Sequence, residues 1–256
     1  LKNGLRLLVN GCTSVAMEFS PECAIPYVSR VDAGTVDAIR ALGVDVRSSG
    51  NLVQRFEAVW DDAALADHQA ASTALYTIKD QAFAMVTERI RGGATVTEFE
   101  VQEAMSEWFK TAGLTSDSAP VVAAQENAGD PHYLPTRERH RVIGPDEVLL
   151  LDLWGKVATP GAVYADITWM GYSGGSVPTR YAEAFAVVRD GRDAAIELVQ
   201  EAVKAGKSLK GWEVDRVARD NIADAGFGDQ FVHRTGHSLG EEVHGNGVHL
   251  DDFETH

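Results

Sequence analysis

The spacing of hydrophobic residues along the chain changes near residue 60. Before that point short elements alternate, and the pattern predicts a strand over 15–19, a helix over 35–42 and a strand over 44–46. Strand and helix in quick succession are typical of an α/β layer. We therefore predict that residues 1–60 belong to an α/β domain and that a domain boundary lies near residue 60.

Beyond this boundary, apolar residues recur at helical spacing from 61 to 90 and predict one long amphipathic helix. A second helix begins at the capping-box pair Thr97 and Glu100 and runs to Gly113. The later pattern predicts strands over 121–124, 147–157 and 162–172, helices over 180–205 and 212–225, and a further strand after them. We predict that residues 61–256 form one α+β domain.

Two aspartates lie on neighbouring predicted strands that form a hairpin. Within 149–154, alternate leucines point to one face and Asp152 to the other, because successive side chains of a strand alternate. On the returning strand Asp166 and Thr168 share one face, and the turn at 159–161 contains Pro and Gly. We expect strand pairing to bring both carboxylates onto the same face of the hairpin.

These aspartates have two interpretations. The plainer one is that they cap turns at strand ends, as Asp commonly does. Asp152, however, lies inside an apolar run with no Lys or Arg near it in the sequence. Burying two ionised carboxylates side by side is costly unless cations or hydrogen-bond donors compensate their charge. The context therefore favours a metal site, and carboxylate oxygens with neutral imidazole suit Mn²⁺, Co²⁺, Zn²⁺ or Fe²⁺.

Histidines gather near the C-terminus, where five of the eight fall within the last 24 residues. Glycines surround two of them, His237 and His244, and allow the backbone to turn sharply around an ion or a substrate. This setting favours a ligand role for His237. For His233, His249 and His256, a hydrogen-bonded role in packing stays equally open.

A turn-rich segment over 127–133 follows a predicted strand, and loops in such places deliver side chains to a cleft. It contains His132, whose imidazole can carry a proton during a reaction. A plain exposed loop histidine is the alternative at this position.

The composition limits the partners and the setting of the protein. Its 256 residues carry 23 basic and 38 acidic side chains, a formal net charge of −15, and no run of basic residues offsets it. Such a surface repels nucleic acid and anionic lipid, so we expect neither as a partner. Two cysteines without a CxxC pair, and no apolar run of membrane-spanning length, predict a reducing, cytoplasmic setting.

Together these residues resemble the pita-bread metallopeptidases, the family of methionine aminopeptidase, Xaa-Pro aminopeptidase and Xaa-Pro dipeptidase (prolidase). The resemblance covers residues 61–256 and rests on an ordered set of motifs. They are Pro131-His132-Tyr133, Asp152-Leu153-Trp154-Gly155, Asp166-Ile167-Thr168, Gly236-His237-Ser238-Leu239-Gly240 and Val243-His244. The motifs look closer to the Xaa-Pro-cleaving branch than to methionine aminopeptidase. Residues 1–60 are similar to the end of the α/β N-terminal domain of that branch and of creatinase.

The resemblance implies a pita-bread (creatinase/aminopeptidase-like) catalytic domain with two divalent metal ions, Mn²⁺ before Co²⁺, Zn²⁺ or Fe²⁺. By this resemblance Asp152 and His237 would each bind one metal, and Asp166 would bridge both. His132 and His244 would handle substrate and protons. Such a metal pair lowers the pKa of a bridging water toward about 7, so that hydroxide can attack a peptide carbonyl.

The substrate implied by the resemblance is a peptide or dipeptide with proline in second position, from which the N-terminal residue is removed. Relatives of this kind are often dimers, so a homodimer stays open as the oligomeric state. The chain departs from the family pattern in the longer spacing from Asp152 to Asp166, where we expect an insertion. It also has Trp169-Met170 where many relatives place Arg.

Two further metal-binding glutamates of the family lie C-terminal to the second histidine of the pattern. Glu254 does not stand in their sequence context, so we do not assign it as a ligand. Because the chain also begins without Met, we expect a fragment that is truncated at both ends, that lacks the last strands of its catalytic domain and that is inactive by itself.

Two other functions stay open at this stage. A non-catalytic pita-bread protein would bind peptides or proteins with the same cleft, although such a cleft gains little from keeping the whole ligand set. A metal-independent hydrolase like creatinase would not be expected to keep the metal-binding aspartates. The sequence favours a dinuclear metallopeptidase over both.

Overall fold

The computed structural model describes residues 2–23 and 28–253, so Glu254 and His256 lie outside the described residues. Its helices are α1 (Lys2–Leu8), α2 (Ala33–Arg40), α3 (Gly50–Glu57), α4 (Asp62–Arg91), α5 (Glu98–Thr111), α6 (Thr179–Ala205) and α7 (Gly211–Asp224). Its strands are β1 (Ser14–Met17), β2 (Asp45–Ser48), β3 (Leu114–Thr115), β4 (Val121–Ala124), β5 (Val148–Val157) and β6 (Ala165–Tyr172). Short 3-10 helices are η1 (Pro21–Cys23), η3 (Gln125–Gly129) and η4 (Gly228–Gln230). The mixed order confirms the predicted α+β class.

The chain divides into two compact units, which are described separately. The first unit comprises Leu1–Val59, Ala186–Ser238 and His244–His256, and the second comprises Trp60–Phe185 and Leu239–Val243. The break after Val59 lies near the boundary expected at residue 60. Residues beyond 185 are divided between both units, so the grouping of 61–256 into one catalytic domain stays a prediction.

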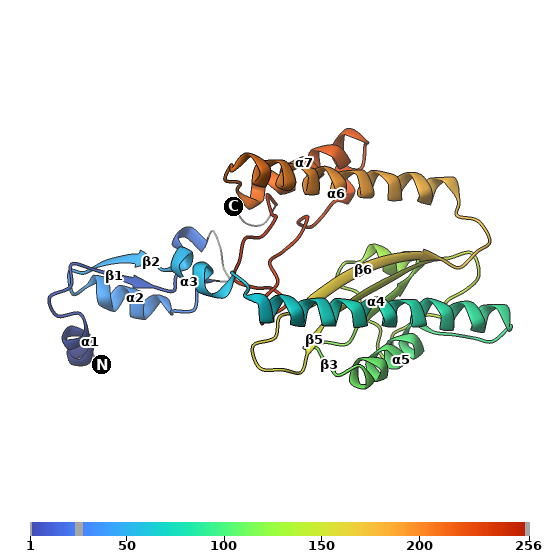
Figure 1. The fold of residues 1–256 in the computed structure, drawn as a ribbon, viewed down its shortest axis with the longest axis horizontal. Helices are drawn as coiled ribbons and strands as arrows, with labels where there is room; N and C mark the ends of the chain where they lie inside the picture. The colour runs from blue at the N-terminus through green and yellow to red at the C-terminus, as the bar shows by residue number, and fades with distance from the viewer. Residues whose placement is uncertain (1, 24–27, 254–256) are drawn as a thin grey trace. The chain divides into compact units, whose positions relative to one another are not determined.

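The N-terminal part of the first unit is a small α/β layer. Strands β1 and β2 pair in parallel, and α2 connects them in the sequence (Figure 1). Their core is formed by Val36, Ile39, Val44 and Val46. Helix α2 begins two residues before its predicted start because the side chain of Asp32 accepts a hydrogen bond from the Thr35 N–H and caps it.

The second unit contains an antiparallel sheet with β5 at its centre. Strands β4 and β6 pair with opposite edges of β5, and β3 pairs antiparallel with the last residues of β5. Helices α4 and α5 pack on one face of this sheet (Figure 1). Helix α5 begins with the predicted capping box, in which Thr97 Oγ1 accepts from the Glu100 N–H at 3.1 Å.

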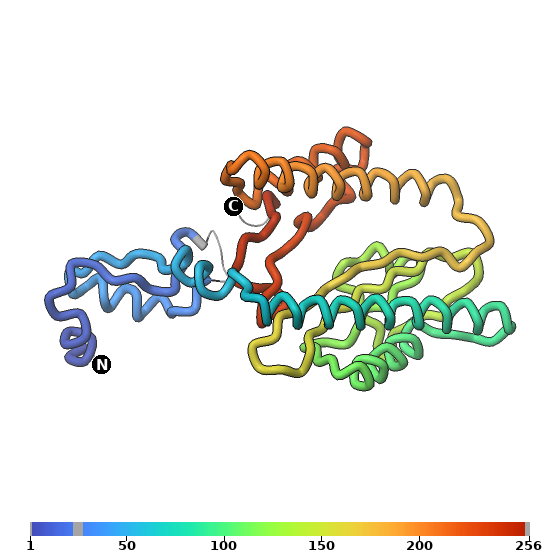
Figure 2. The backbone as a smooth tube through the Cα atoms, in the orientation of Figure 1, coloured from blue at the N-terminus to red at the C-terminus, as the bar shows by residue number. Residues whose placement is uncertain are grey.

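The C-terminal part of the first unit is a pair of helices. The chain doubles back from α6 into α7 (Figure 2), and Ala195, Val214 and Ala218 form the core between them. Gly191 permits a close approach, because a Cβ at this position would lie 3.2 Å from the Ala218 carbonyl oxygen.

Two differences from the sequence-based expectation concern short segments. Helices α1 and α3 were not predicted; they are seven and eight residues long and bury no residue. After α7 the described residues contain no extended strand, only an isolated bridge between Gly236 and Leu250, so the predicted further strand is wrong for this part. Across 2–23 and 28–253, none of the helices combines the length and apolarity needed to cross a bilayer.

Candidate active site

Asp152 and Asp166 lie on the same face of the β5–β6 hairpin. Asp152 pairs with Thr168, and Asp166 pairs with Trp154, so the two aspartates are diagonal neighbours across the ladder. Residues in this relation lie about 7–8 Å apart. Both aspartates are half-buried, and Thr168 Oγ1 donates a 2.9 Å hydrogen bond to Asp152 Oδ1. The expected placement on one face is confirmed, and Asp152 caps no turn because it lies in the middle of β5.

The opposite face of β5 fixes this orientation. Leu149, Leu151 and Leu153 are at most 2% exposed and pack into the core that α4 and α5 share with the sheet. A slip of one residue in the strand register would turn the leucines outward and Asp152 into this core. Hydrophobic burial on one side of the strand therefore determines the position of the carboxylates on the other.

The segment Leu239–Val243 is attached to the turn end of the same hairpin. The Tyr164 N–H donates to the Gly240 carbonyl oxygen at 2.9 Å, and Lys156 Nζ donates to the Glu241 carbonyl oxygen at 2.5 Å. Lys156 also lies 5.1 Å from the centre of the Tyr164 ring. The chain that connects the two candidate histidines is thus tied to the strands that carry the two aspartates.

His237 and His244 lie side by side in the first unit. Their ring centres are 4.5 Å apart, with an angle of 83° between the ring planes. The turn between them is held by the Gly245 N–H, which donates to the Ser238 carbonyl oxygen at 2.8 Å. Gly247 is required here because a Cβ would lie 2.2 Å from Ser238 Oγ. The close approach at Gly247 supports the expected need for glycine at this one position, and the wider expectation that glycines let the backbone turn sharply around these histidines stays a prediction.

His249 has a role in holding this loop, one of the two interpretations left open for it. Its Nδ1 accepts a 3.2 Å hydrogen bond from the Ser238 N–H, and the side chain is buried. Burial, followed by the positive charge of Arg234, lowers the pKa of His249 to about 4. A neutral ring is what allows Nδ1 to act as an acceptor next to His237.

Asp215 on α7 also holds this loop, and its role was not predicted from the sequence. Its carboxylate is fully buried and accepts hydrogen bonds from the Thr235 N–H at 2.7 Å and the Asp252 N–H at 3.1 Å. Arg219, one turn further along α7, donates to the same carboxylate at 2.9 Å. Asp215 therefore fixes the backbone on both sides of the bridge between Gly236 and Leu250.

We expect Asp215→Asn to destabilise the fold by about 2 kcal/mol at pH 7, since it removes a buried charge that several donors compensate. Burial raises the pKa of Asp215, but hydrogen bonds from Arg219 and Thr235 outweigh it and hold the pKa below its usual value. A lowered folded-state pKa stabilises the fold above about pH 4, and this contribution is lost as the pH falls through the folded-state pKa. Urea unfolding of wild type and Asp215→Asn at pH 7 and pH 3 measures the difference in the free energy of unfolding.

The matched control is Asp220→Asn, an exposed aspartate on the same helix, which we expect to change the free energy of unfolding by less than about 0.5 kcal/mol. The difference between wild type and Asp215→Asn should shrink at pH 3. A difference of equal size at both pH values would contradict a role for the ionised carboxylate.

His132 lies in the second unit, on the loop that follows β4, and its side chain is exposed. Its backbone N–H donates to Asp130 Oδ1 at 2.9 Å. The next residue, Tyr133, is buried and donates from its hydroxyl to Glu98 Oε2 at 2.5 Å. Burial, and then the hydrogen bond to Glu98, raise the pKa of the Tyr133 phenol above its usual range, so it stays protonated and remains a donor.

The candidate ligands thus form two partial sets. The structure places His132, Asp152 and Asp166 in the second unit, and His237 and His244 in the first. The carboxylate oxygens and imidazole nitrogens suit a first-row divalent metal by their chemistry. Among residues 2–23 and 28–253, no group of three or more His, Cys, Asp or Glu side chains is arranged to hold a metal ion.

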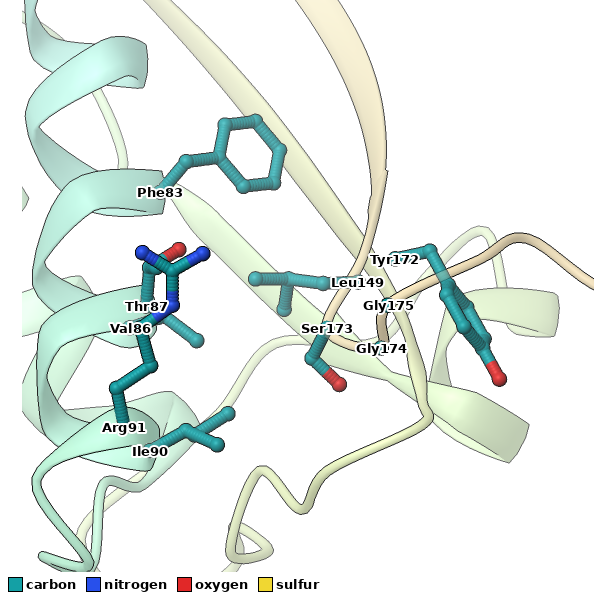
Figure 3. Close-up of a pocket in the computed structure, with 10 residues that line it drawn as sticks. All are labelled: Phe83, Val86, Thr87, Ile90, Arg91, Leu149, Tyr172, Ser173, Gly174 and Gly175. Atoms are coloured by element: carbon teal, nitrogen blue, oxygen red, sulfur yellow. The ribbon is translucent and has the colours of Figure 1, made fainter.

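A separate cavity of about 270 Å³ lies between the end of α4 and the ends of β5 and β6 (Figure 3). It opens on the helix-covered side of the sheet, where its walls include Phe83, Val86 and Leu149. Arg91 and Ser173 contribute polar groups to its lining. It contains none of the predicted site residues and lies on the other face of the sheet from Asp152.

A family model described as metallopeptidase family M24 matches residues 72–255. The Xaa-Pro dipeptidase of Lactobacillus helveticus is 33% identical over 160 residues, which are 62% of this chain and 38% of that protein. The Xaa-Pro dipeptidase of Lactobacillus delbrueckii subsp. lactis is 32% identical over 184 residues, 68% of this chain and 45% of that protein. The crystal structure of dipeptidase PepE from Mycobacterium ulcerans matches 99% of this chain and 61% of its own, with a TM-score of 0.68 and 21% identity.

These similarities confirm the pita-bread fold that the sequence predicts. The chain spans less than half the length of the two curated relatives and 61% of the solved structure, so it corresponds to part of that architecture.

Proposed function

This chain belongs to metallopeptidase family M24, and from that premise we propose that its protein removes the N-terminal residue from peptides with proline in second position. The observation that carries the proposal is the register of the β5–β6 hairpin, which sets Asp152 and Asp166 on one face within the matched residues. The names of the two Lactobacillus relatives support the preference for an Xaa-Pro bond.

Asp152, Asp166 and His237 are the residues that would hold divalent metal ions, with Mn²⁺ as the first candidate. When bound, such ions lower the pKa of a coordinated water and polarise the carbonyl under attack. The two aspartates supply negative charge that offsets the ions, and Thr168 orients one carboxylate through its hydrogen bond. Three ligands do not satisfy two ions, so a complete dinuclear site needs further carboxylates besides these three residues.

His132 and His244 are proposed to bind substrate and to move protons. Both side chains are exposed and therefore accessible to a peptide. An imidazole can donate a proton from one ring nitrogen while the other accepts a hydrogen bond, which suits a group that serves the leaving amine.

Metal removal tests the proposal directly. We expect the full-length protein to release proline from an Xaa-Pro dipeptide, to lose this activity after dialysis against a chelator, and to regain it with Mn²⁺. A dipeptide with alanine in place of proline is the matched control and should be cleaved more slowly.

Two results would count against this function. Full activity in the metal-free protein would indicate a metal-independent hydrolase. Tight binding of Xaa-Pro peptides without any hydrolysis in the Mn²⁺-loaded protein would indicate a binding protein instead.

A further inference from the structure

We propose that Glu98, the first residue of α5, is a positioning residue that holds the loop carrying His132. The loop, which we define as residues 124–133, lies with Glu98 in the second unit. The inference rests on the proposed function, because positioning matters for activity only if His132 acts on the substrate.

Glu98 is fully buried, and its carboxylate binds both ends of this loop. Oε1 accepts from the Ala124 N–H at 2.7 Å and from Asn127 Nδ2 at 3.0 Å. Oε2 accepts from the Tyr133 hydroxyl at 2.5 Å. His132 therefore lies between Asn127 and Tyr133, two residues that donate to the same carboxylate.

The same carboxylate also joins the loop to the segment around Arg141, which precedes β5 in the sequence. Oε2 accepts from the Arg141 N–H at 2.8 Å, and the Glu98 N–H donates to the Arg141 carbonyl oxygen at 3.1 Å. The guanidinium of Arg141 binds Glu126 and Glu147 instead, each at 2.5 Å. The carboxylate of Glu98 thus connects α5 by hydrogen bonds to the loop that carries His132 and to the backbone of Arg141.

Backbone and side-chain dipoles compensate the buried charge of Glu98. Four different residues donate to its two oxygens, and it occupies the first turn of a 14-residue helix, where the helix dipole favours an anion. A carboxylate satisfied in this way is a firm attachment point, since moving any one donor would weaken the compensation of a buried charge.

The loop has a conformation that needs such an attachment. Gln125 has a φ of 51°, in the left-handed region that non-glycine residues rarely adopt. This residue lies between Ala124 and Asn127, both bound to Glu98, and its side-chain oxygen accepts from the Val148 N–H at 3.3 Å. Strained backbone of this kind persists only where the surroundings determine it, as they do at functional loops.

Hydrogen exchange of the full-length protein tests whether Glu98 holds the loop. In Glu98→Gln, an NH2 group replaces one carboxylate oxygen. Because this group is a donor, the side chain can no longer accept hydrogen bonds from all four residues. We expect amide exchange in the loop to rise by about tenfold or more, while exchange in the core of β5 stays unchanged. Unchanged exchange in the loop would overturn the proposal.

The matched control is Glu103→Gln, because Glu103 is an exposed glutamate on the same helix that pairs with Arg137 at 3.6 Å. It should alter neither exchange in the loop nor activity. If Glu98→Gln does not fold, Tyr133→Phe carries the test, because it removes a single donor from the carboxylate and should raise loop exchange in the same direction.

A double-mutant cycle distinguishes positioning of His132 from general support of the fold. We expect Glu98→Gln to lower kcat on an Xaa-Pro dipeptide by about ten- to a hundredfold, the size typical of residues that orient a reacting group. In a His132→Ala background the same change should cost less than about threefold. Equal losses in both backgrounds would overturn the positioning role.

The two proposals fail in different ways. A wild-type protein without Xaa-Pro activity would contradict the proposed function, and the exchange measurement would still decide whether Glu98 holds the loop. An active wild type with additive losses in the cycle would leave the proposed function standing and remove only the role of Glu98.

Discussion

Replacing Asp166 with alanine is expected to lower kcat/KM for an Xaa-Pro dipeptide by about a thousandfold or more in the full-length, Mn²⁺-loaded protein. A divalent ion supplies several kcal/mol of transition-state stabilisation, and about 1.4 kcal/mol corresponds to a tenfold change in rate. Asp166 shares its face with Asp152, so its loss leaves one carboxylate where two are needed to offset the ions. Initial rates at several Mn²⁺ concentrations measure the effect.

Asp80→Asn is the control for Asp166→Ala. Asp80 is an exposed aspartate of the same unit, on α4, which packs against the other face of the sheet, and its carboxylate binds Lys79 at 2.8 Å. Its replacement should leave kcat/KM within about twofold of wild type, as expected of a surface change away from the site. Activity retained in Asp166→Ala under conditions where the fold is intact would refute the two-aspartate mechanism.

Leu151→Ala should destabilise the fold by about 2–5 kcal/mol, the cost of a cavity where a buried leucine stood. Leu151 is fully buried at the centre of the sheet and lies next in sequence to Asp152. Its packing holds the register that turns Asp152 outward. The free energy of unfolding in urea measures the effect.

Leu150→Ala is the matched control for Leu151→Ala, because it makes the same change one residue away on the half-buried opposite face. We expect it to cost about 1 kcal/mol or less, since the side chain leaves little core volume empty. Equal destabilisation by both replacements would contradict a core that lies on one side of β5 only.

The sequence predicted the elements whose signals are local. A helical period of apolar residues and a capping box predicted α4 and α5, and both helices form within two residues of the expected bounds. The alternation of leucines with Asp152 predicted the faces of β5, because a strand has a period of two regardless of its partners.

The candidate ligands were found from the sequence for a similar reason. Asp152, Asp166, His132, His237 and His244 stand in short motifs whose spacing is visible along the chain, and the family match covers all five. Their roles as metal ligands and proton carriers stay proposals that the experiments above decide.

The supporting residues could not be predicted, because their partners are distant in the sequence. Glu98 binds donors 26 to 43 residues away, and Asp215 binds backbone donors 20 and 37 residues away in addition to the nearby Arg219. Each is an acidic residue on a helix, which in sequence is typical of a solvent-exposed position. Only the tertiary structure shows that both are buried.

The sequence by itself determined helices α2 and α4 to α7, the hairpin and the face on which its two aspartates lie, because these follow from local periodicity and from the burial of alternate side chains. Only the tertiary structure decided which distant backbone groups meet the buried carboxylates of Glu98 and Asp215. A hydrogen bond depends on distances of about 3 Å between groups that the chain order leaves far apart, and no spacing along the sequence encodes them.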